Sequence, residues 1–410
     1  MRYFNTEGVC RPDEHYMVRL DDRLDKIKRL YVDRRKYFVI NRGRQYGKTT
    51  TLRALKEYLK DEYFVVSMDF QGISTEEFAD AQTFVCAFAK EFLASFADGK
   101  KVELLKPLAK FAEDKEDKSL RELFVRLSQI CAAADRPIVL LIDEADSASN
   151  NQVFIDFLAQ LRGYYLRMEE RAIFHSVVLA GVYDIKNLKL KIRYDTEHQY
   201  NSPWNIAANF DIDMSFSVKQ ITAMLKEYET DHHTGMDIVS IAEEIYRYTS
   251  GYPYLVSAIC KAMDEKLPER GIFADTKSIW SRRGIAEAVK IMLKENIPLF
   301  DSMIRQLDEY RKLRSVIEKI MFQGKPTAFS PAEKYMNLGC MFGFLKEENG
   351  NVVIANRIFE MYLLDLFMAE ESLNSEMFSY GQMNKNQFVR GNRLEMDLVL
   401  EKRKKMRMLF

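Results

Sequence analysis

The chain has 410 residues, which exceeds one typical hydrophobic core, so we expect two or three domains. Its 61 basic and 61 acidic side chains balance, so the overall charge favours neither a nucleic acid nor a membrane as partner. No window approaches the roughly 20 consecutive apolar residues of a membrane span, and the N-terminus lacks the apolar stretch of a signal peptide, so we expect a cytoplasmic protein without membrane contact.

The first predicted strand, residues 37–40, runs into a glycine-bearing loop that ends in Gly47-Lys48-Thr49, and a helix is expected over 50–59. In such a unit the loop N–H groups and the helix N-terminus point at one anion. The lysine reaches the outer phosphates, and the threonine hydroxyl holds Mg²⁺. The pattern predicts a phosphate-binding loop, and the alternative is an ordinary helix start.

This loop departs from the usual G-x-x-x-x-G-K-[ST] pattern at its first glycine, where Arg42 stands and Gly43 comes one residue late. Arg42 and Arg44 would replace neutral residues beside phosphates, where they could raise affinity or reach a partner; exposure to solvent is the alternative. The residues expected to contact nucleotide here are Arg42, Gly43, Arg44, Gln45, Tyr46, Gly47, Lys48, Thr49 and Thr50.

Strand and helix patterns alternate over the first half of the chain. Near-continuous apolar runs, typical of strands covered on both faces, follow at 63–70, 137–142 and 173–180, and a fifth strand is expected near 209–216. Helical patterns lie between them at 78–96, 119–133 and 153–168. The alternation predicts an α/β fold with a parallel five-stranded sheet, helices on both faces, and the ligand at the carboxyl ends of the strands.

The run at 137–142 delivers two acids, Asp143 and Glu144. We expect Asp143 to hold Mg²⁺ together with Thr49, and Glu144 to polarise the water that attacks the γ phosphate. The alternative is that acids simply end this strand. Because the strand at 63–70 lies between the two signatures, Asp143 need not follow the strand adjacent to the loop strand.

Beyond Phe216 the strand pattern stops. Ser217 and Gln220 predict a capping box that begins a helical lid, and a later hairpin pattern around Asn349-Gly350 follows more helices. This order predicts a winged-helix-like C-terminal domain. The expected domains are a P-loop ATPase core at 1–216, a helical lid at 217–270, a helical and winged-helix-like domain at 275–370, and a polar tail at 371–410.

These motifs resemble those of the bacterial and archaeal AAA-like ATPases near the STAND and archaeal-ATPase group. The segments that carry the resemblance are 41–49, 141–146, 179–185, 202–206 and 249–253, within about residues 1–265. The resemblance assigns Gly251-Tyr252-Pro253 to a lid motif that packs near adenine, which makes Pro253 a nucleotide contact. From the residues alone, Pro253 suits a first helical turn and Gly251 a flexible joint, so a purely structural turn is the alternative.

Two residues beyond the strand at 173–180 are candidates for the γ phosphate. Asp184 could be a sensor or merely a polar strand end, and Arg193 could be an arginine finger that acts within the chain or on a neighbour. The basic residues around Arg193 could also form a solvated face or a polyanion contact. Lys48, Asp143, Glu144 and Arg193 are thus the expected catalytic residues.

Many proteins of the resembling group carry a nuclease-like domain of the PD-(D/E)xK type after the winged-helix-like region. Residues 378–388 and 394–398 resemble the run-in to that domain, but no Asp followed by Glu-x-Lys remains. We therefore expect no nuclease activity and a truncated or frameshifted tail.

The sequence predicts an ATP-dependent molecular switch that uses ATP and Mg²⁺, with a protein partner or a homo-oligomer. One alternative is a nucleic-acid-binding winged-helix module regulated by ATP. The expected recognition helix at 332–341 has only Glu333 and Lys334 as charged residues, which argues against it. The other alternative, supported by Arg42 in place of glycine, is a nucleotide-binding scaffold that does not hydrolyse.

Overall fold

A computed structural model describes residues 2–96, 102–114, 118–148, 150–182, 204–322 and 326–374 of the chain. The chain divides into two compact units, Met1–Phe359 and Glu360–Phe410. Both sheets lie in the first unit, and the last helix, α16 (Arg357–Asn374), crosses the boundary. Within the described ranges, every helix is too short or too polar to span a bilayer.

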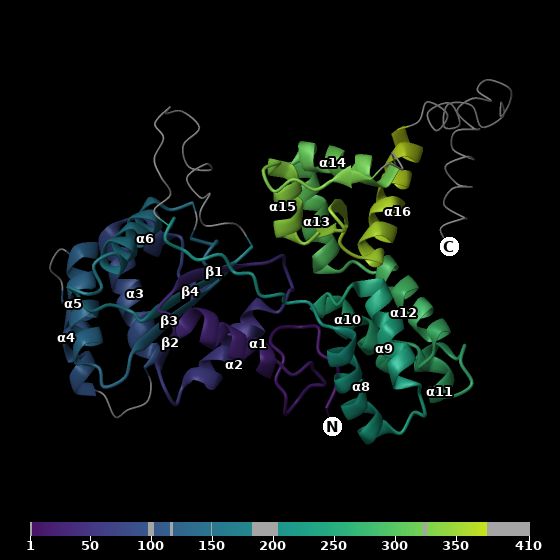
Figure 1. Ribbon diagram of the computed structural model, residues 1–410, viewed down its shortest axis with the longest axis horizontal. Coiled ribbons are helices and arrows are strands. Elements are labelled where there is room, and N and C mark those ends of the chain that lie inside the picture. Colours follow the sequence, from purple (N-terminus) through teal and green to yellow (C-terminus); the bar gives the residue numbers. More distant parts are fainter. Residues whose placement is uncertain are drawn as a thin grey trace. The chain divides into compact units, whose positions relative to one another are not determined.

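Four parallel strands form the central sheet. They are β1 (Tyr37–Asn41), β2 (Phe64–Asp69), β3 (Ile138–Asp143) and β4 (Ser176–Gly181), in the order β1-β4-β3-β2 (Figure 1). The register pairs Asn41 with Gly181 and Asp69 with Asp143, so the carboxyl ends lie along one edge. β4 separates the phosphate-loop strand from the strand of Asp143, as the spacing of the two signatures allowed.

Helices cover both faces of this sheet, as predicted. The evidence is that alternate residues of β1 belong to two separate hydrophobic cores. Tyr37 and Val39 pack with one core, and Phe38 and Ile40 with the other. The first core is covered by α3 (Ala81–Ser95), α4 (Val102–Glu113), α5 (Leu120–Ala133) and α6 (Gln152–Tyr165), and the second by α1 (Asp21–Ile27) and α2 (Lys48–Leu59) (Figure 1). Of these helices, α4 is the one for which the sequence pattern predicted no helix.

The expected fifth strand near residues 209–216 does not form in the described part of the sheet. Its backbone pairs with β1 at an isolated bridge between Phe38 and Ala208, and the Phe210 ring stacks on Phe38. Beyond it, the carbonyl oxygens of Phe210 and Ile212 accept hydrogen bonds from the Arg42 guanidinium, each at 3.2 Å. The Arg42 side chain thus bonds to backbone oxygens that a neighbouring strand would otherwise bond to. A pattern of alternating apolar residues cannot predict such side-chain bonds.

The lid begins as predicted with α8 (Val218–His232), whose capping box joins Ser217 and Gln220. It continues through α9 (Ile238–Thr249) and α10 (Pro253–Lys261), followed by α11 (Thr276–Ile279) and α12 (Arg282–Lys294). Single π-helical turns lie at Lys28–Val32 and Ala262–Lys266, and 3₁₀ turns lie at Phe70–Gly72, Glu76–Phe78 and Pro268–Arg270.

Two helices, α13 (Pro298–Glu309) and α14 (Arg311–Phe322), lead to a small antiparallel sheet of order β5-β7-β6. Its strands are β5 (Thr327–Ala328), β6 (Leu345–Glu348) and β7 (Asn351–Ile354), and α15 (Lys334–Phe342) precedes β6. The predicted hairpin is confirmed: Asn349 and Gly350 form its turn with φ of 51° and 78°, as a two-residue hairpin loop requires.

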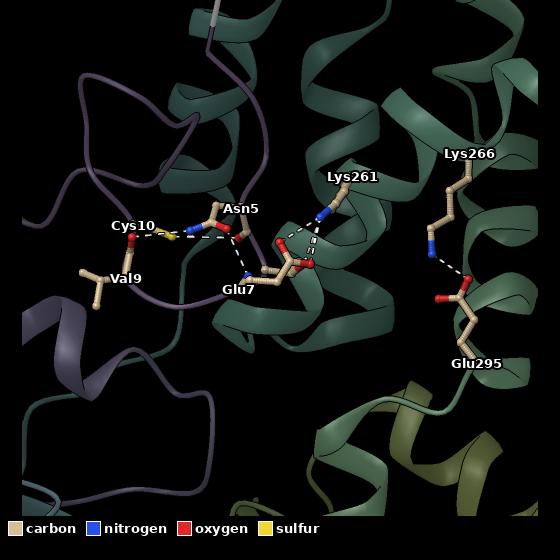
Figure 2. A network of polar contacts seen from close by, with 8 residues as sticks. Asn5, Glu7, Val9, Cys10, Lys261, Lys266 and Glu295 are labelled. Carbon is tan, nitrogen blue, oxygen red and sulfur yellow. Dashed lines mark hydrogen bonds and ion pairs between the residues drawn. The ribbon is translucent and has the colours of Figure 1, made fainter. Parts of the chain in front are cut away.

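The N-terminal segment, residues 2–16, connects the lid to the sheet domain. Glu7 forms an ion pair with Lys261 of α10 at 2.9 Å, while Asn5 binds the backbone of Glu7 and Val9 (Figure 2). At Cys10 the backbone N–H donates to the Thr50 hydroxyl of α2, at 3.5 Å. This segment therefore contacts both the helix that follows the phosphate loop and the lid.

Candidate nucleotide-binding site

The phosphate loop, residues 42–47, joins β1 directly to the N-terminus of α2. Gly47 precedes the helix with a left-handed φ of 78°, which glycine adopts without strain. Gln45 is also left-handed, with φ of 55°, although it carries a side chain. Such a conformation costs on the order of 1 kcal/mol or more and is kept only where surrounding contacts hold it. The loop's strained position is thus Gln45, which the sequence analysis did not single out.

Lys48 lies inside the loop. Its Nζ donates to the carbonyl oxygens of Arg42 and Gly43, at 3.0 and 3.1 Å, and the residue is only 6% exposed. Burial lowers the pKa of Lys48, while the carboxylates of Glu144 and Asp146 act in the opposite direction. The ammonium group therefore sits between the loop and the acids that follow β3.

Asp143 and Glu144 stand at the carboxyl end of β3 as predicted. Burial raises the pKa of Asp143, whereas hydrogen bonds from the Thr49 hydroxyl and the Glu144 N–H lower it. Burial also raises the pKa of Glu144, and the neighbouring Asp146 adds to this effect. Glu144 is left-handed, with φ of 48°, a backbone outlier of the kind that gathers at functional sites.

The acidic loop, residues 143–146, is tied to the neighbouring strand. Ala145 donates its N–H to Ala180 at 2.9 Å, and Val182 donates its N–H to Asp146 Oδ2 at 3.0 Å. A Cβ on Gly181 would lie 2.7 Å from Asp146 Oδ1, so only glycine fits there without a shift. The role of Asp146 was not predicted from the sequence, although its place three residues after Asp143 marked it as part of the same loop.

Thr49 and Asp143 come from α2 and β3, and they lie close enough for the Thr49 hydroxyl to lower the pKa of Asp143. A hydroxyl and a carboxylate are the hard oxygen ligands that Mg²⁺ prefers. Asp69, opposite Asp143 on β2, adds negative charge that also raises the pKa of Asp143. The residues present therefore fit a divalent cation beside the phosphate loop.

A family profile described as an AAA-like domain matches residues 32–365. The chain belongs to this AAA-like family of P-loop ATPases. The resemblance drawn from its motifs is thereby confirmed, and nucleotide binding is established at the level of the family. No curated protein matches the sequence.

Solved structures similar to this chain include the Walker-type ATPase PABY2304 of Pyrococcus abyssi, with a TM-score of 0.54 and 13% identity over 88% of this chain and 99% of that one. Cdc6p from Pyrobaculum aerophilum matches with a TM-score of 0.40 and 14% identity, over 90% and 97% of the two chains. The RuvB Holliday junction branch migration motor of Thermotoga maritima matches with a TM-score of 0.40 and 13% identity, over 83% and 93%. At such identity the first of these supports the P-loop ATPase fold alone.

Arg42 of this AAA-like protein is half-buried, so it is not the solvent-exposed side chain of the alternative, and its contact with phosphate stays a prediction. Its guanidinium donates to Phe210 and Ile212 and, at 3.0 Å, to the carbonyl oxygen of Asn41, so the side chain is committed to backbone oxygens. It anchors the start of the phosphate loop to the segment before the lid. Arg44 is exposed to solvent, which was the alternative to a phosphate or partner contact.

Gly43 is explained by a close approach from another module. A Cβ at Gly43 would lie 2.3 Å from the carbonyl oxygen of Phe342, at the end of α15. The glycine that comes one residue late in the motif therefore makes room for the C-terminal helices. The sequence motif describes where glycines are needed for phosphate binding, and it does not predict that a glycine is needed for packing against Phe342.

The other expected nucleotide contacts are distributed around the loop. Tyr46 and Thr50 contact Ser215 and Cys10, and Pro253 is buried at the first turn of α10. Arg193 and Asp184 lie outside the described residues, as does the tail beyond residue 374. The structure thus brings together Lys48, Thr49, Asp143 and Glu144, and it leaves the role of Arg193 a prediction.

Proposed function

We propose that this protein binds ATP with Mg²⁺ at the carboxyl end of its parallel sheet and hydrolyses it as a conformational switch. The observation that carries the proposal is the meeting of Thr49 with Asp143 beside Lys48. These three groups, from the loop helix and from a strand two places away, supply the hydroxyl, carboxylate and ammonium that a nucleoside triphosphate and its cation need.

Each residue has a definite task in this proposal. Lys48 exchanges its two loop carbonyls for phosphate oxygens, and the N-terminus of the 12-residue helix α2 adds its free N–H groups. Glu144 accepts the proton of the attacking water, and its raised pKa brings it nearer to the working pH of a general base. Thr49 and Asp143 would hold Mg²⁺, and the bound cation would neutralise part of the phosphate charge.

The remaining modules would respond to the nucleotide. The order α13, α14, β5, α15, β6, β7 supports a winged-helix-like module, and we propose that it and the lid change position as the γ phosphate is held or lost. The domain bounds we propose are those expected from the sequence: core 1–216, lid 217–270 and winged-helix-like domain 275–370.

The experiment compares Mg²⁺-dependent ATP binding and hydrolysis in the parent, Lys48→Ala and Glu144→Gln. Lys48→Ala removes charged hydrogen bonds worth roughly 1.5–3 kcal/mol, so ATP affinity should fall at least about tenfold. Glu144→Gln should still bind ATP while turnover falls by about 10²–10⁴. Lys56→Ala in the same helix and Glu91→Gln on α3 are matched controls that should behave as the parent.

Equal ATP binding by the parent and Lys48→Ala would overturn the site. Undiminished turnover by Glu144→Gln would overturn the general base. Multiple turnovers by the parent would exclude the non-hydrolysing scaffold, and a salt-dependent shift of DNA that persists in Lys48→Ala would favour the nucleic-acid-binding alternative.

A further inference from the structure

Three segments that lie far apart in the sequence meet in a closed ring of contacts beside the phosphate loop. They are the loop itself, residues 213–216 before the lid, and the turn between α9 and α10. The ring starts at Tyr46, passes through Ser215, Phe216 and Gly251, and returns to the loop through Tyr252.

The first link joins the loop to the segment before the lid. The Tyr46 hydroxyl and Ser215 Oγ lie 2.9 Å apart, and the Ser215 N–H is held by Asp213 Oδ1, also at 2.9 Å. Burial raises the pKa of Tyr46, so its hydroxyl stays protonated and remains able to donate.

The second link joins that segment to the lid turn. Phe216 donates its N–H to the carbonyl oxygen of Gly251 at 2.8 Å. Gly251 is left-handed, with φ of 75°, and a Cβ there would lie 2.0 Å from the carbonyl oxygen of Phe216. Its own N–H donates to the Thr249 hydroxyl at 3.1 Å. The flexible joint expected at Gly251 is therefore a tight, fully bonded contact.

The third link returns from the lid to the loop. The Tyr252 hydroxyl donates to the carbonyl oxygen of Arg44, and its ring meets the Tyr46 ring edge-on, with centroids 4.5 Å apart. Tyr252 is only 2% exposed. Through one side chain the lid thus touches both residues that flank the strained Gln45.

We propose that Tyr252 and Tyr46 are positioning residues that hold the kink of the phosphate loop at Gln45 and thereby couple ATP affinity to the lid. The inference rests on the proposed function. A left-handed Gln45 needs outside support, and Tyr252, at the start of α10 in the lid, supplies it through its contacts with Arg44 and Tyr46. A lid that opens would remove the Tyr252 contacts, and the loop would lose its binding shape.

The test uses Tyr252→Phe, which keeps the ring and removes only the hydroxyl. Tyr254→Phe, two residues along the same helix, is the matched control. The Kd for ATP should rise about 2- to 13-fold, which corresponds to the roughly 0.5–1.5 kcal/mol of one lost hydrogen bond. The rate at saturating ATP should stay at the parent value, because bound phosphates then hold the loop. A merely structural defect would instead lower the melting temperature and the amount of active protein.

Hydrogen exchange of the loop amides in the nucleotide-free protein separates this proposal from the proposed function. Tyr252→Phe should speed exchange at residues 44–48 relative to the parent and to Tyr254→Phe. In the double variant that carries both Tyr252→Phe and Tyr46→Phe, the increase in exchange should be smaller than the sum of the increases in the two single variants. Unchanged exchange, or faster exchange with unchanged ATP affinity, would overturn the coupling. Faster exchange in a chain whose parent binds no ATP would support the loop-holding contact and overturn the proposed function.

Discussion

Two loops at the same edge of the sheet are held in place by contacts from different parts of the molecule. The acidic loop, residues 143–146, is fastened by its neighbouring strand, through the bonds of Ala145 to Ala180 and of Val182 to Asp146. The phosphate loop, residues 42–47, has one bond to that strand, from the Arg42 N–H to Gly181, while its later residues bond to Ser215 and Tyr252, which lie outside the sheet. The acids thus take their geometry from the sheet itself, whereas Arg44 and Tyr46 of the phosphate loop are contacted by residues outside it. Substitutions in the two loops should therefore separate chemistry from binding.

The largest effect is expected from Gly251→Ala, which breaks the support of the phosphate loop. The added Cβ meets the Phe216 carbonyl oxygen at 2.0 Å in a left-handed backbone. We expect a loss of roughly 3 kcal/mol in the free energy of unfolding, measured by urea denaturation.

Gly72→Ala is its control, because a Cβ at Gly72 has no atom within 4 Å. If Gly251→Ala unfolds at the same urea concentration as Gly72→Ala, the turn is not the tight contact described.

The next effect should come from Asp146→Ala, which tests the acidic loop. Loss of the carboxylate leaves the Val182 N–H without its acceptor, which costs about 1–2 kcal/mol of stability. Because the loop that carries Glu144 keeps the Ala145 bond to Ala180 but loses its second bond, to Val182, turnover should fall more than ATP affinity does. Asp146→Asn keeps an acceptor oxygen and should restore most of the turnover in the same assay.

A drop in ATP affinity larger than the drop in turnover would show that the acidic loop also supports binding. The contrast between the two loops would then be lost.

The smallest effect is expected at Glu7, which lies on the N-terminal segment and pairs with Lys261 (Figure 2). Its hydrogen bond with Lys261 lowers the pKa of Glu7 from 4.5. The pair therefore contributes stability above the ordinary carboxyl pKa and loses it as pH falls through the lowered value. Because Glu7 is largely exposed, Glu7→Gln should cost at most about 0.5 kcal/mol at pH 7.

Urea denaturation at pH 7 and near pH 3 checks this, since the difference between Glu7→Gln and the parent should shrink at the lower pH. A change in ATP affinity in Glu7→Gln would mean that the N-terminal segment, too, holds the phosphate loop.

Local patterns in the chain predicted most of the elements. The four strands of the sheet, the capping box of Ser217 and Gln220 and the hairpin at Asn349-Gly350 appear where short-range rules place them. The failures are equally instructive. The segment expected as a fifth strand instead accepts hydrogen bonds from the Arg42 side chain. Helix α4 was not predicted, although its apolar residues belong to the first core.

By itself the sequence determined the strand, loop and helix that carry Lys48 and Thr49, and the strand that ends in Asp143 and Glu144. Those signals are local, because periodicity and the Gly-Lys-Thr spacing involve neighbouring residues. Tertiary structure alone decided what Arg42, Tyr46 and Gly251 do. The loop's partners lie 168 to 208 positions away in the chain, and no short-range pattern in the loop specifies a hydrogen-bond partner at that distance.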